Sequence, residues 1–181
     1  MFRRMKLTSV VDFPREIHIY LLERWAELME PIRPKFIDAG LVGKKFTEKA
    51  PDMPWKRLNY SFAPDGTWVF DWESNVDTGD TIITYPDDET GYRSLADPDY
   101  DFTKAFLSGV FKIEPSAEDA VKMFPMMPDM QKFFRKAIRD TEKRYNLKLP
   151  KYPRSWVKKL FKRKSSYANL PPPMEKMVEL V

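Results

Sequence analysis

The first part of the chain carries apolar residues at the spacing of one helix face, recurring every three or four positions. This stripe consists of Ile17, Leu21, Trp25, Leu28, Ile32 and Phe36. Pro31 and Pro34 interrupt it, and because proline removes a backbone donor and clashes with the preceding turn, we expect a break or kink there. The pattern predicts a helix over 14–39, followed by a loop from Gly40 to Pro54.

Strict alternation replaces the helical period after residue 57. One set of alternating positions is strongly apolar: Leu58, Tyr60, Phe62, Trp68, Phe70 and Trp72. The turn sequence Pro64-Asp65-Gly66 divides this set into two halves. The pattern predicts a β-hairpin with one aromatic face.

The remaining pattern alternates between strand and helix. β-forming residues predict a strand over 80–85, stopped by Pro86, and a second strand over 110–114. Two helices are expected within 88–108, and Gly109, the next residue, stands where the second of them would end. A long final helix, interrupted at Pro125 and Pro128, is expected to run to about Tyr145.

Three segments within this region carry a family resemblance. They read T-I-I-T-Y-P-D-D from Thr81, A-F-L-S-G-V-F-K-I from Ala105, and A-V-K-M from Ala120. In this order they resemble the sterol-carrier-protein (nonspecific lipid-transfer) domain family over residues 55–135. One departure is Glu114-Pro115-Ser116, which stands where the family commonly has a glycine-containing turn.

The resemblance implies an α+β fold: a mixed sheet of about five strands, covered by helices, that encloses a hydrophobic cavity. It also suggests three parts. These are an N-terminal helical extension (1–54), the sterol-carrier-type lipid-binding domain (55–147), and a basic segment with a C-terminal tail (148–181).

Two facing apolar walls are expected to bind the ligand. The aromatic hairpin face supplies one, and the resemblance places the methionine-rich helix over the family's tunnel as the other. Methionine is flexible and polarizable, so such a wall adapts to ligands of varied shape. The candidate ligand-binding residues are Tyr60, Phe62, Trp68, Phe70, Trp72, Phe102, Phe106, Phe111, Met123, Phe124, Met126, Met127, Met130, Phe133 and Phe134. The alternative interpretation is an ordinary, fully packed core.

The resemblance implies binding and carriage, or presentation, of a hydrophobic small molecule. Lipids, acyl chains, acyl-CoA esters and sterol-like rings are all candidates, and the sequence does not choose among them. The alternative is a non-catalytic interaction subunit of a larger enzyme complex that uses the same fold. A third hypothesis is an accessory domain that presents a hydrophobic substrate to an enzyme.

The composition limits the class of protein and its expected location in the cell. The chain has 181 residues, 43% of them hydrophobic, which is enough for one core, and it has no cysteine. That absence excludes disulfides and thiolate metal sites and suits a cytoplasmic protein. No apolar run reaches the roughly 18 residues of a membrane span, and no signal-peptide core follows the N-terminus. We therefore expect a soluble, cytoplasmic protein.

Charge is unevenly distributed, although the formal net charge is only +4. Carboxylates dominate from Asp71 to Asp101, where Arg93 is the only base, and a solvated rim is the expected interpretation. From Lys148 to Lys164 all the charged side chains are cationic.

The basic segment predicts a surface helix. On such a helix its apolar residues share one face and its cations surround it: Trp156, Val157, Lys158, Lys159, Leu160, Phe161, Lys162 and Arg163. This pattern is typical of a helix lying on an anionic membrane or docking to a partner, and the alternative is a solvated helix. Nucleic acid is a weaker choice, because no binding module is recognisable and the acidic half opposes a broad basic footprint.

The C-terminal tail suggests a protein partner. Met174, Met177, Val178 and Val181 stand at helical spacing, beyond a stiff spacer formed by Pro171 to Pro173. Such an exposed apolar stripe requires cover, either from its own domain or from a partner, and the spacer favours a partner.

Catalytic chemistry has little support in the sequence. His18 is the only histidine, and its apolar neighbours favour a structural role. Ser108 lies in no G-x-S-x-G motif, and no phosphate-binding loop or metal-ligand spacing is present. We expect no catalytic residue, no metal and no cofactor, and therefore not an enzyme.

Overall fold

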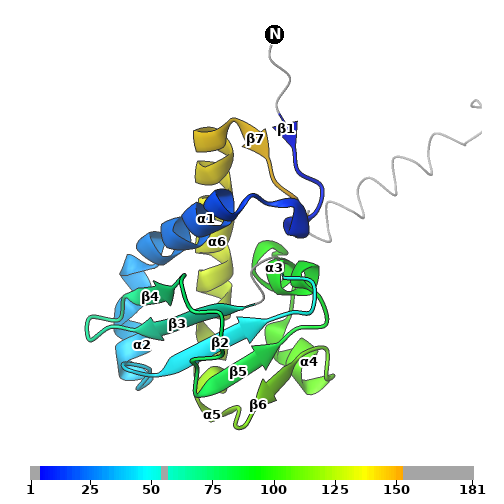
Figure 1. The fold of residues 1–181 in the computed structure, drawn as a ribbon. Coiled ribbons are helices and arrows are strands. Elements are labelled where there is room, and N and C mark those ends of the chain that lie inside the picture. Colours follow the sequence, from blue (N-terminus) through cyan, green and yellow to red (C-terminus); the bar gives the residue numbers. More distant parts are fainter. Residues whose placement is uncertain (1–4, 54–56, 153–181) are drawn as a thin grey trace, which may run out of the picture.

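A mixed sheet of five strands, in the order β4-β3-β2-β5-β6, forms the centre of the molecule in the computed structural model (Figure 1). The structure describes residues 5–53 and 57–152. The strands of this sheet are β2 (Lys45–Lys49), β3 (Leu58–Phe62), β4 (Trp68–Asp71), β5 (Thr81–Thr84) and β6 (Lys112–Glu114). Strands β2 and β5 are parallel, and the other neighbours are antiparallel.

Six α-helices and three 3-10 turns are present in the described residues. They are η1 (Val10–Asp12), α1 (Arg15–Leu28), η2 (Glu30–Ile32), α2 (Arg33–Asp38), α3 (Asp88–Ala96), α4 (Phe102–Leu107), α5 (Glu118–Val121), η3 (Phe124–Met126) and α6 (Met127–Tyr145). The breaks predicted at Pro31, Pro34, Pro125 and Pro128 are confirmed, because each proline lies in a 3-10 turn or at the start of a helix. Helix α6 ends where Asn146 adopts the left-handed conformation.

The predicted hairpin and its aromatic face are confirmed. Tyr60 pairs with Phe70 and Phe62 pairs with Trp68, so the aromatic side chains share one face. The α+β class and the five-stranded mixed sheet are likewise as expected.

The predicted loop over 40–54 is wrong in its central part. Strand β2 lies there, in the middle of the sheet, between β3 and β5. Its sequence, Lys-Phe-Thr-Glu-Lys, has one strongly apolar side chain, Phe46, so hydrophobic alternation did not reveal it. Buried Thr47 is instead satisfied by a hydrogen bond that its Oγ1 donates to Asn59 Oδ1 over 2.6 Å.

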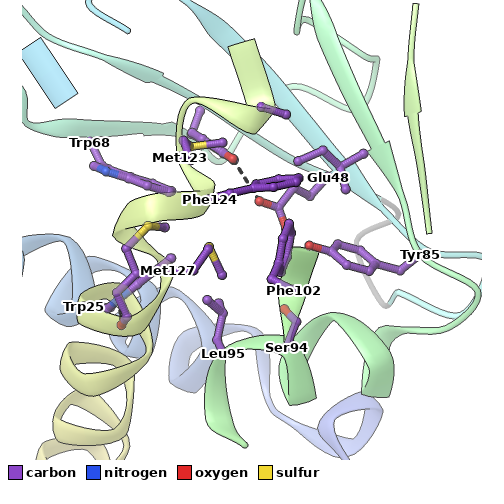
Figure 2. A pocket seen from close by; sticks show the side chains of 14 residues that line it. Trp25, Glu48, Trp68, Tyr85, Ser94, Leu95, Phe102, Met123, Phe124 and Met127 are labelled. Atoms are coloured by element: carbon purple, nitrogen blue, oxygen red, sulfur yellow. Dashed lines mark hydrogen bonds between the residues drawn. The ribbon is translucent and has the colours of Figure 1, made fainter. Parts of the chain in front are cut away.

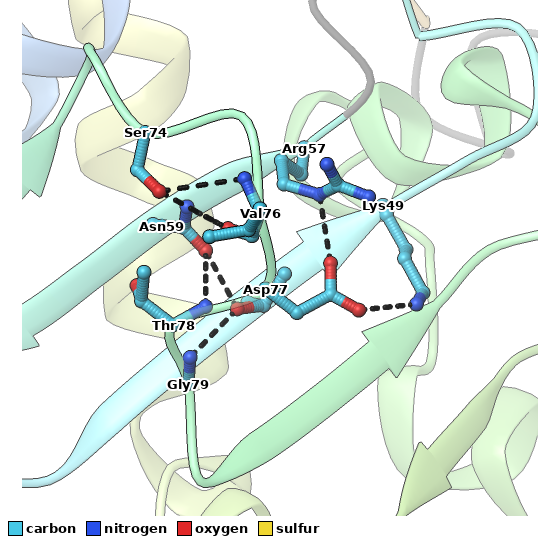
Figure 3. A network of polar contacts seen from close by, with 9 residues as sticks. Lys49, Arg57, Asn59, Ser74, Val76, Asp77, Thr78 and Gly79 are labelled. Carbon is cyan, nitrogen blue, oxygen red and sulfur yellow. Dashed lines mark hydrogen bonds and ion pairs between the residues drawn. The ribbon is translucent and has the colours of Figure 1, made fainter.

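A polar network covers the sheet face that carries Thr47 and Asn59 (Figure 3). The Asn59 amide donates to the Val76 carbonyl over 2.9 Å, and the Gly79 N–H donates to Thr47 Oγ1 over 2.9 Å. Asp77 pairs with Lys49 and Arg57 over 2.7 Å each. The loop between β4 and β5 is therefore tied to the sheet by part-buried hydrogen bonds and by ion pairs.

The acidic run is more than the solvated rim that the sequence predicted. Asp88 and Asp97 are buried, and Asp97 pairs with Arg93 over 3.2 Å. Together with the Asp77 pairs, these contacts show that part of the run is structural.

The opposite sheet face packs on helices α1, α2 and α6. Trp25 of α1 lies 4.9 Å from Trp68 of β4, and Phe36 of α2 lies 5.1 Å from Phe62 of β3, between ring centroids. Helix α1 crosses α6 obliquely and packs against it (Figure 1). The segment before residue 55 thus shares one hydrophobic core with the sheet.

A separate two-stranded parallel pair joins β1 (Met5–Lys6) to β7 (Leu147–Lys148), which follows α6. The described N-terminal residues and the end of the described chain therefore lie side by side (Figure 1). None of the helices in residues 5–53 and 57–152 is long and apolar enough to cross a membrane.

Candidate functional site

An apolar pocket lies between the helix-covered face of the sheet and helices α3 to α6 (Figure 2). Its lining comes from every layer of the fold. The lining residues are Trp25, Glu48, Tyr60, Trp68, Ile83, Tyr85, Ser94, Leu95, Phe102, Ala120, Met123, Phe124, Met127 and Met130.

Aromatic stacking forms the sheet side of the pocket. Tyr60 and Trp68 stack with ring centroids 4.5 Å apart, because β3 and β4 place them diagonally on the same face. Trp25 closes this side from α1, and its indole Nε1 donates to the Met130 carbonyl over 2.9 Å. This hydrogen bond fixes α1 against α6 at the pocket wall.

Helix residues form the other side. Phe102 of α4 packs edge-on against Phe124, with ring centroids 5.1 Å apart, and Met123 and Met127 flank that turn (Figure 2). Unbranched methionine side chains change rotamer at low cost, so this wall is deformable.

One carboxyl group interrupts the apolar lining. Glu48 of β2 accepts a hydrogen bond from the Tyr60 hydroxyl over 2.9 Å and also bonds to Tyr85. Burial raises the pKa of the Glu48 carboxyl above its ordinary value, and the two tyrosine hydrogen bonds oppose that shift. Burial, followed by the Glu48 charge, also raises the pKa of both tyrosines well above their ordinary value.

The pocket is small in this conformation, with a cavity volume of about 20 Å³. That space holds about one water molecule. A lipid therefore enters only if lining side chains move.

Seven of the fifteen candidate ligand-binding residues line this pocket. They are Tyr60, Trp68, Phe102, Met123, Phe124, Met127 and Met130. Phe62, Phe111, Met126 and Phe134 are buried in the surrounding core, and Phe106 and Phe133 are partly buried against it. Phe70 and Trp72 lie apart from the pocket.

Phe70 and Trp72 instead line a surface groove of about 390 Å³ between β4 and α1. Their rings stack with centroids 4.9 Å apart. Glu23 and Glu27 of α1 lie on the other side of this groove, and Glu23 accepts a hydrogen bond from the Trp72 indole over 3.1 Å.

The sequence did not single out the other seven lining residues as ligand-binding. Trp25 belongs to the predicted helical stripe, and Ile83 and Tyr85 alternate on the predicted third strand, so both patterns carried a signal for burial. Glu48 gave no such signal, because a glutamate between Thr47 and Lys49 is typical of a solvated segment.

His18 and Ser108, for which the sequence supports no catalytic role, have structural positions. His18 is buried beside Phe13, and burial lowers the pKa of its imidazole to about 3. Ser108 caps the C-terminal end of α4. In the described part of the chain, no group of three or more histidine, aspartate or glutamate side chains is arranged to hold a metal ion. The proposed membrane or partner surface, from Trp156 to Arg163, and the C-terminal tail lie outside the described residues.

Comparison with known proteins finds similarity in structure alone. No protein-family model matches the chain, and no curated protein matches it. A solution structure of a conserved hypothetical protein from Thermus thermophilus, suggested to be a sterol carrier protein, superposes with a TM-score of 0.51 at 10% identity. The match covers 75% of this chain and 95% of that one.

Two further solved structures match with lower scores. The UbiJ-SCP2 ubiquinone synthesis protein has a TM-score of 0.44 at 13% identity, with 65% of this chain and 99% of that chain covered. Sterol carrier protein domain 2 of Helicoverpa armigera has a TM-score of 0.40 at 15% identity, with 70% and 96% covered. The order of strands and helices, the segments Thr81–Asp88 and Ala105–Ile113, and the match to the Thermus thermophilus protein agree: this chain has a sterol-carrier-protein-type fold.

Proposed function

We propose that the protein binds a hydrophobic small molecule in the pocket between the sheet and helices α3 to α6, and carries or presents it without catalysis. The observation that carries this proposal is the apolar lining itself, which joins stacked aromatic rings on one side to methionines on the other. The description of the Thermus thermophilus protein as a suggested sterol carrier supports the same class of ligand.

The end of α4 is the proposed opening of this pocket. Phe124 lines the cavity, and its ring centroid lies 5.6 Å from that of Phe106 at the end of α4. Next to Phe106, Leu107 and Val110 expose 77% and 42% of their surface, an apolar rim at which a lipophile is desolvated gradually. Rotation of Phe124 and Met123 away from the cavity would admit a ligand without unfolding the sheet.

Binding of Nile red, a neutral hydrophobic dye, tests the proposal. We expect its fluorescence to rise with the protein and the rise to fall strongly in Met127→Trp, because the indole fills the cavity. Met127→Leu is the matched control, since its similar volume leaves the pocket nearly unchanged. Equal dye binding by all three proteins, each verified as folded by circular dichroism, would refute a ligand site here.

The alternative function, an interaction subunit of an enzyme complex, has one supporting observation. Strand β4 lies at the sheet edge, its Val69 is 49% exposed, and the groove of Phe70 and Trp72 runs beside it. An extended partner segment that pairs with β4 and places side chains in the groove would bury both.

If this second function is correct, loss of the outward N–H of Phe70 should disrupt the complex but not ligand binding. The Ala63 N–H donates to the Thr67 carbonyl, so these two residues are a hydrogen-bonded pair. Because hydrogen-bonded pairs alternate along an antiparallel hairpin, Val69 is hydrogen-bonded to β3, and the backbone N–H of Phe70 points away from β3. Phe70→Pro removes this donor without breaking the ladder. A complex recovered from the source cells should therefore be lost while Nile red binding persists.

Phe70→Ala is the matched control, because it removes the same ring but keeps the N–H. A complex that survives in Phe70→Ala and not in Phe70→Pro indicates strand pairing at β4. If native mass spectrometry finds the same complex with Phe70→Pro, the subunit hypothesis loses its structural support.

A further inference from the structure

Two pockets adjoin at Glu48. The second lies between η1, α1, β2, β3 and α3, and it shares Glu48, Tyr85 and Leu95 with the first. Its cavity volume is about 40 Å³. These shared side chains lie between the two spaces, so displacement of one of them would produce a single longer cavity with Glu48 at its middle.

The polar atoms at this junction form one connected cluster. Tyr60 Oη donates to Glu48 Oε1 over 2.9 Å, and the Tyr85 hydroxyl bonds to both Glu48 and Ser94. Figure 2 shows the Glu48 and Tyr85 side chains approaching one another at the pocket wall, with Ser94 below them. Strand β2 directs Glu48 inward because it is two residues from buried Phe46 and therefore on the same sheet face.

A carboxyl at this position is costly for the fold alone. The residues paired with Glu48 on the two neighbouring strands, Leu58 and Ile83, are apolar and buried. An aliphatic side chain at residue 48 would pack against them without burying a titratable group. Buried carboxyls beside a cavity are typical of sites at which the polar group meets a ligand.

Charge around the junction determines which ligand group fits. None of the fourteen residues that line the first pocket is cationic. In the second pocket His18 is neutral near pH 7, because burial lowers its pKa to about 3, and Asp88 adds a second carboxyl. Burial and the nearby Asp52 raise the pKa of Asp88 to about 7. A ligand carboxylate would thus be desolvated next to acids, without a compensating cation.

A hydroxyl group has no such penalty. It donates a hydrogen bond to Glu48 when the carboxyl is ionised and accepts one when the carboxyl is protonated. Both tyrosine hydroxyls donate their single proton to Glu48, so they hold the carboxyl in position for the ligand hydroxyl.

We propose that Glu48, with Tyr60 and Tyr85, binds the hydroxyl group of a lipophilic alcohol at the junction of the two pockets and excludes fatty-acid carboxylates. This inference rests on the proposed function and specifies its ligand class. The alcohol enters at the end of α4, past Phe124 and Met123, and its apolar body occupies the space between Trp68, Phe102 and Met127.

Displacement of Nile red by a matched pair of ligands tests this selectivity. Dodecanol and dodecanoate have the same chain length and are compared at about pH 8, where the free fatty acid is ionised. We expect dodecanol to displace the dye at a concentration at least about tenfold lower than dodecanoate, with a fatty acid-free buffer as the blank.

Variants identify the group responsible. Glu48→Gln keeps the shape and hydrogen bonding of the side chain but cannot ionise, so the alcohol-to-acid ratio should fall towards one. Glu142→Gln is the matched control, because Glu142 is a buried glutamate that bonds to Leu149 and Lys151 away from both pockets. Tyr60→Phe, which removes one donor to Glu48, should shift the ratio in the same direction as Glu48→Gln and serves if that variant does not fold.

The outcomes separate the two proposals. If the wild-type protein binds neither Nile red nor dodecanol, the proposed function itself fails. If Nile red binds but both ligands displace it equally, or if Glu48→Gln preserves a tenfold preference, the ligand site stands and the role of Glu48 is overturned.

Discussion

The indole Nε1 of Trp25 donates a hydrogen bond to the backbone carbonyl of Met130 over 2.9 Å, and both residues line the same pocket. These residues are 105 positions apart, on α1 and α6. The helix that the sequence assigned to an extension is therefore part of the pocket wall, and its stability and that of the site are coupled.

Replacement of Trp25 should weaken the whole fold. Trp25→Phe removes the buried hydrogen bond between α1 and the Met130 carbonyl of α6, and it reduces the contacts with Trp68 and Phe134. We expect a loss of about 2–3 kcal/mol in the free energy of unfolding, measured by urea denaturation. Trp72→Phe is the control: its indole bonds to exposed Glu23, so the loss should stay below about 1 kcal/mol. Equal losses would show that the buried hydrogen bond has no special weight.

A glycine just before β5 should be the least replaceable in the described chain. A Cβ on Gly79 would lie 2.4 Å from the carbonyl carbon of Phe46 and 2.4 Å from the nitrogen of Thr47. Both atoms are backbone of the central strand, so they have little freedom to move.

Gly79→Ala is therefore expected to cost about 3 kcal/mol or more and to disturb the network of Figure 3. Gly40→Ala provides the comparison, because Gly40 has a φ of +70° but no atom within 4 Å of the place that a Cβ would occupy. Its cost should be about 1 kcal/mol, from backbone strain alone. Thermal melts of both variants measure the difference, and a Gly79 variant as stable as the Gly40 variant would contradict the close contact.

Asp88 should make stability depend on pH. Its pKa is raised to about 7 by burial, followed by the charges of Asp52, Glu89 and Asp87. An acid whose folded pKa exceeds its unfolded value, about 3.9, keeps its proton longer in the folded state. Its contribution to stability is therefore intact at low pH and is lost as pH rises from about 4 to 7.

Asp88→Asn removes this dependence because asparagine does not ionise. The stability of the variant relative to wild type should therefore increase from about pH 5 to about pH 8, by at most about 4 kcal/mol. Urea denaturation of both proteins at both pH values measures this increase. A stability difference that is the same at both pH values would show that Asp88 does not titrate in this range.

The sequence predicted best where one side of an element is apolar throughout. The hairpin of Tyr60 and Trp68 and the helix of Met127 and Met130 were predicted because their periods of two and 3.6 are regular. Strand β2 was missed because its inward positions are Phe46 and Glu48, and a single phenylalanine does not define a period.

The limits of local sequence pattern also explain which site residues were misplaced or missed. Alternation placed Phe70 and Trp72 on the correct sheet face, but it carries no information on where the covering helices end, and both rings lie beyond the pocket in the edge groove. Glu48 became a site residue only when β2, β3 and β5 brought it to Tyr60 and Tyr85. Such a cluster joins residues far apart in sequence, so local pattern could not reveal it.

The basic segment beyond the described residues gives the last prediction, which rests on its sequence. Lys158, Lys159, Lys162 and Arg163 surround the apolar positions Trp156, Leu160 and Phe161. We expect the protein to bind vesicles that contain anionic lipid, each cation near the surface contributing about 1 kcal/mol before screening. Binding should weaken with added salt, because the Debye length shortens to about 8 Å at physiological ionic strength.

Replacement of these four cations by glutamine should abolish most vesicle binding in a sedimentation assay and leave the thermal melt unchanged. The matched control replaces four exposed cations of the described fold, Lys45, Lys104, Lys112 and Lys136, which removes the same charge from other surfaces. If both variants lose binding equally, net charge rather than the amphipathic segment is responsible. If the wild-type protein binds neutral and anionic vesicles alike, the electrostatic mechanism is wrong, and the apolar positions alone would have to account for the attachment.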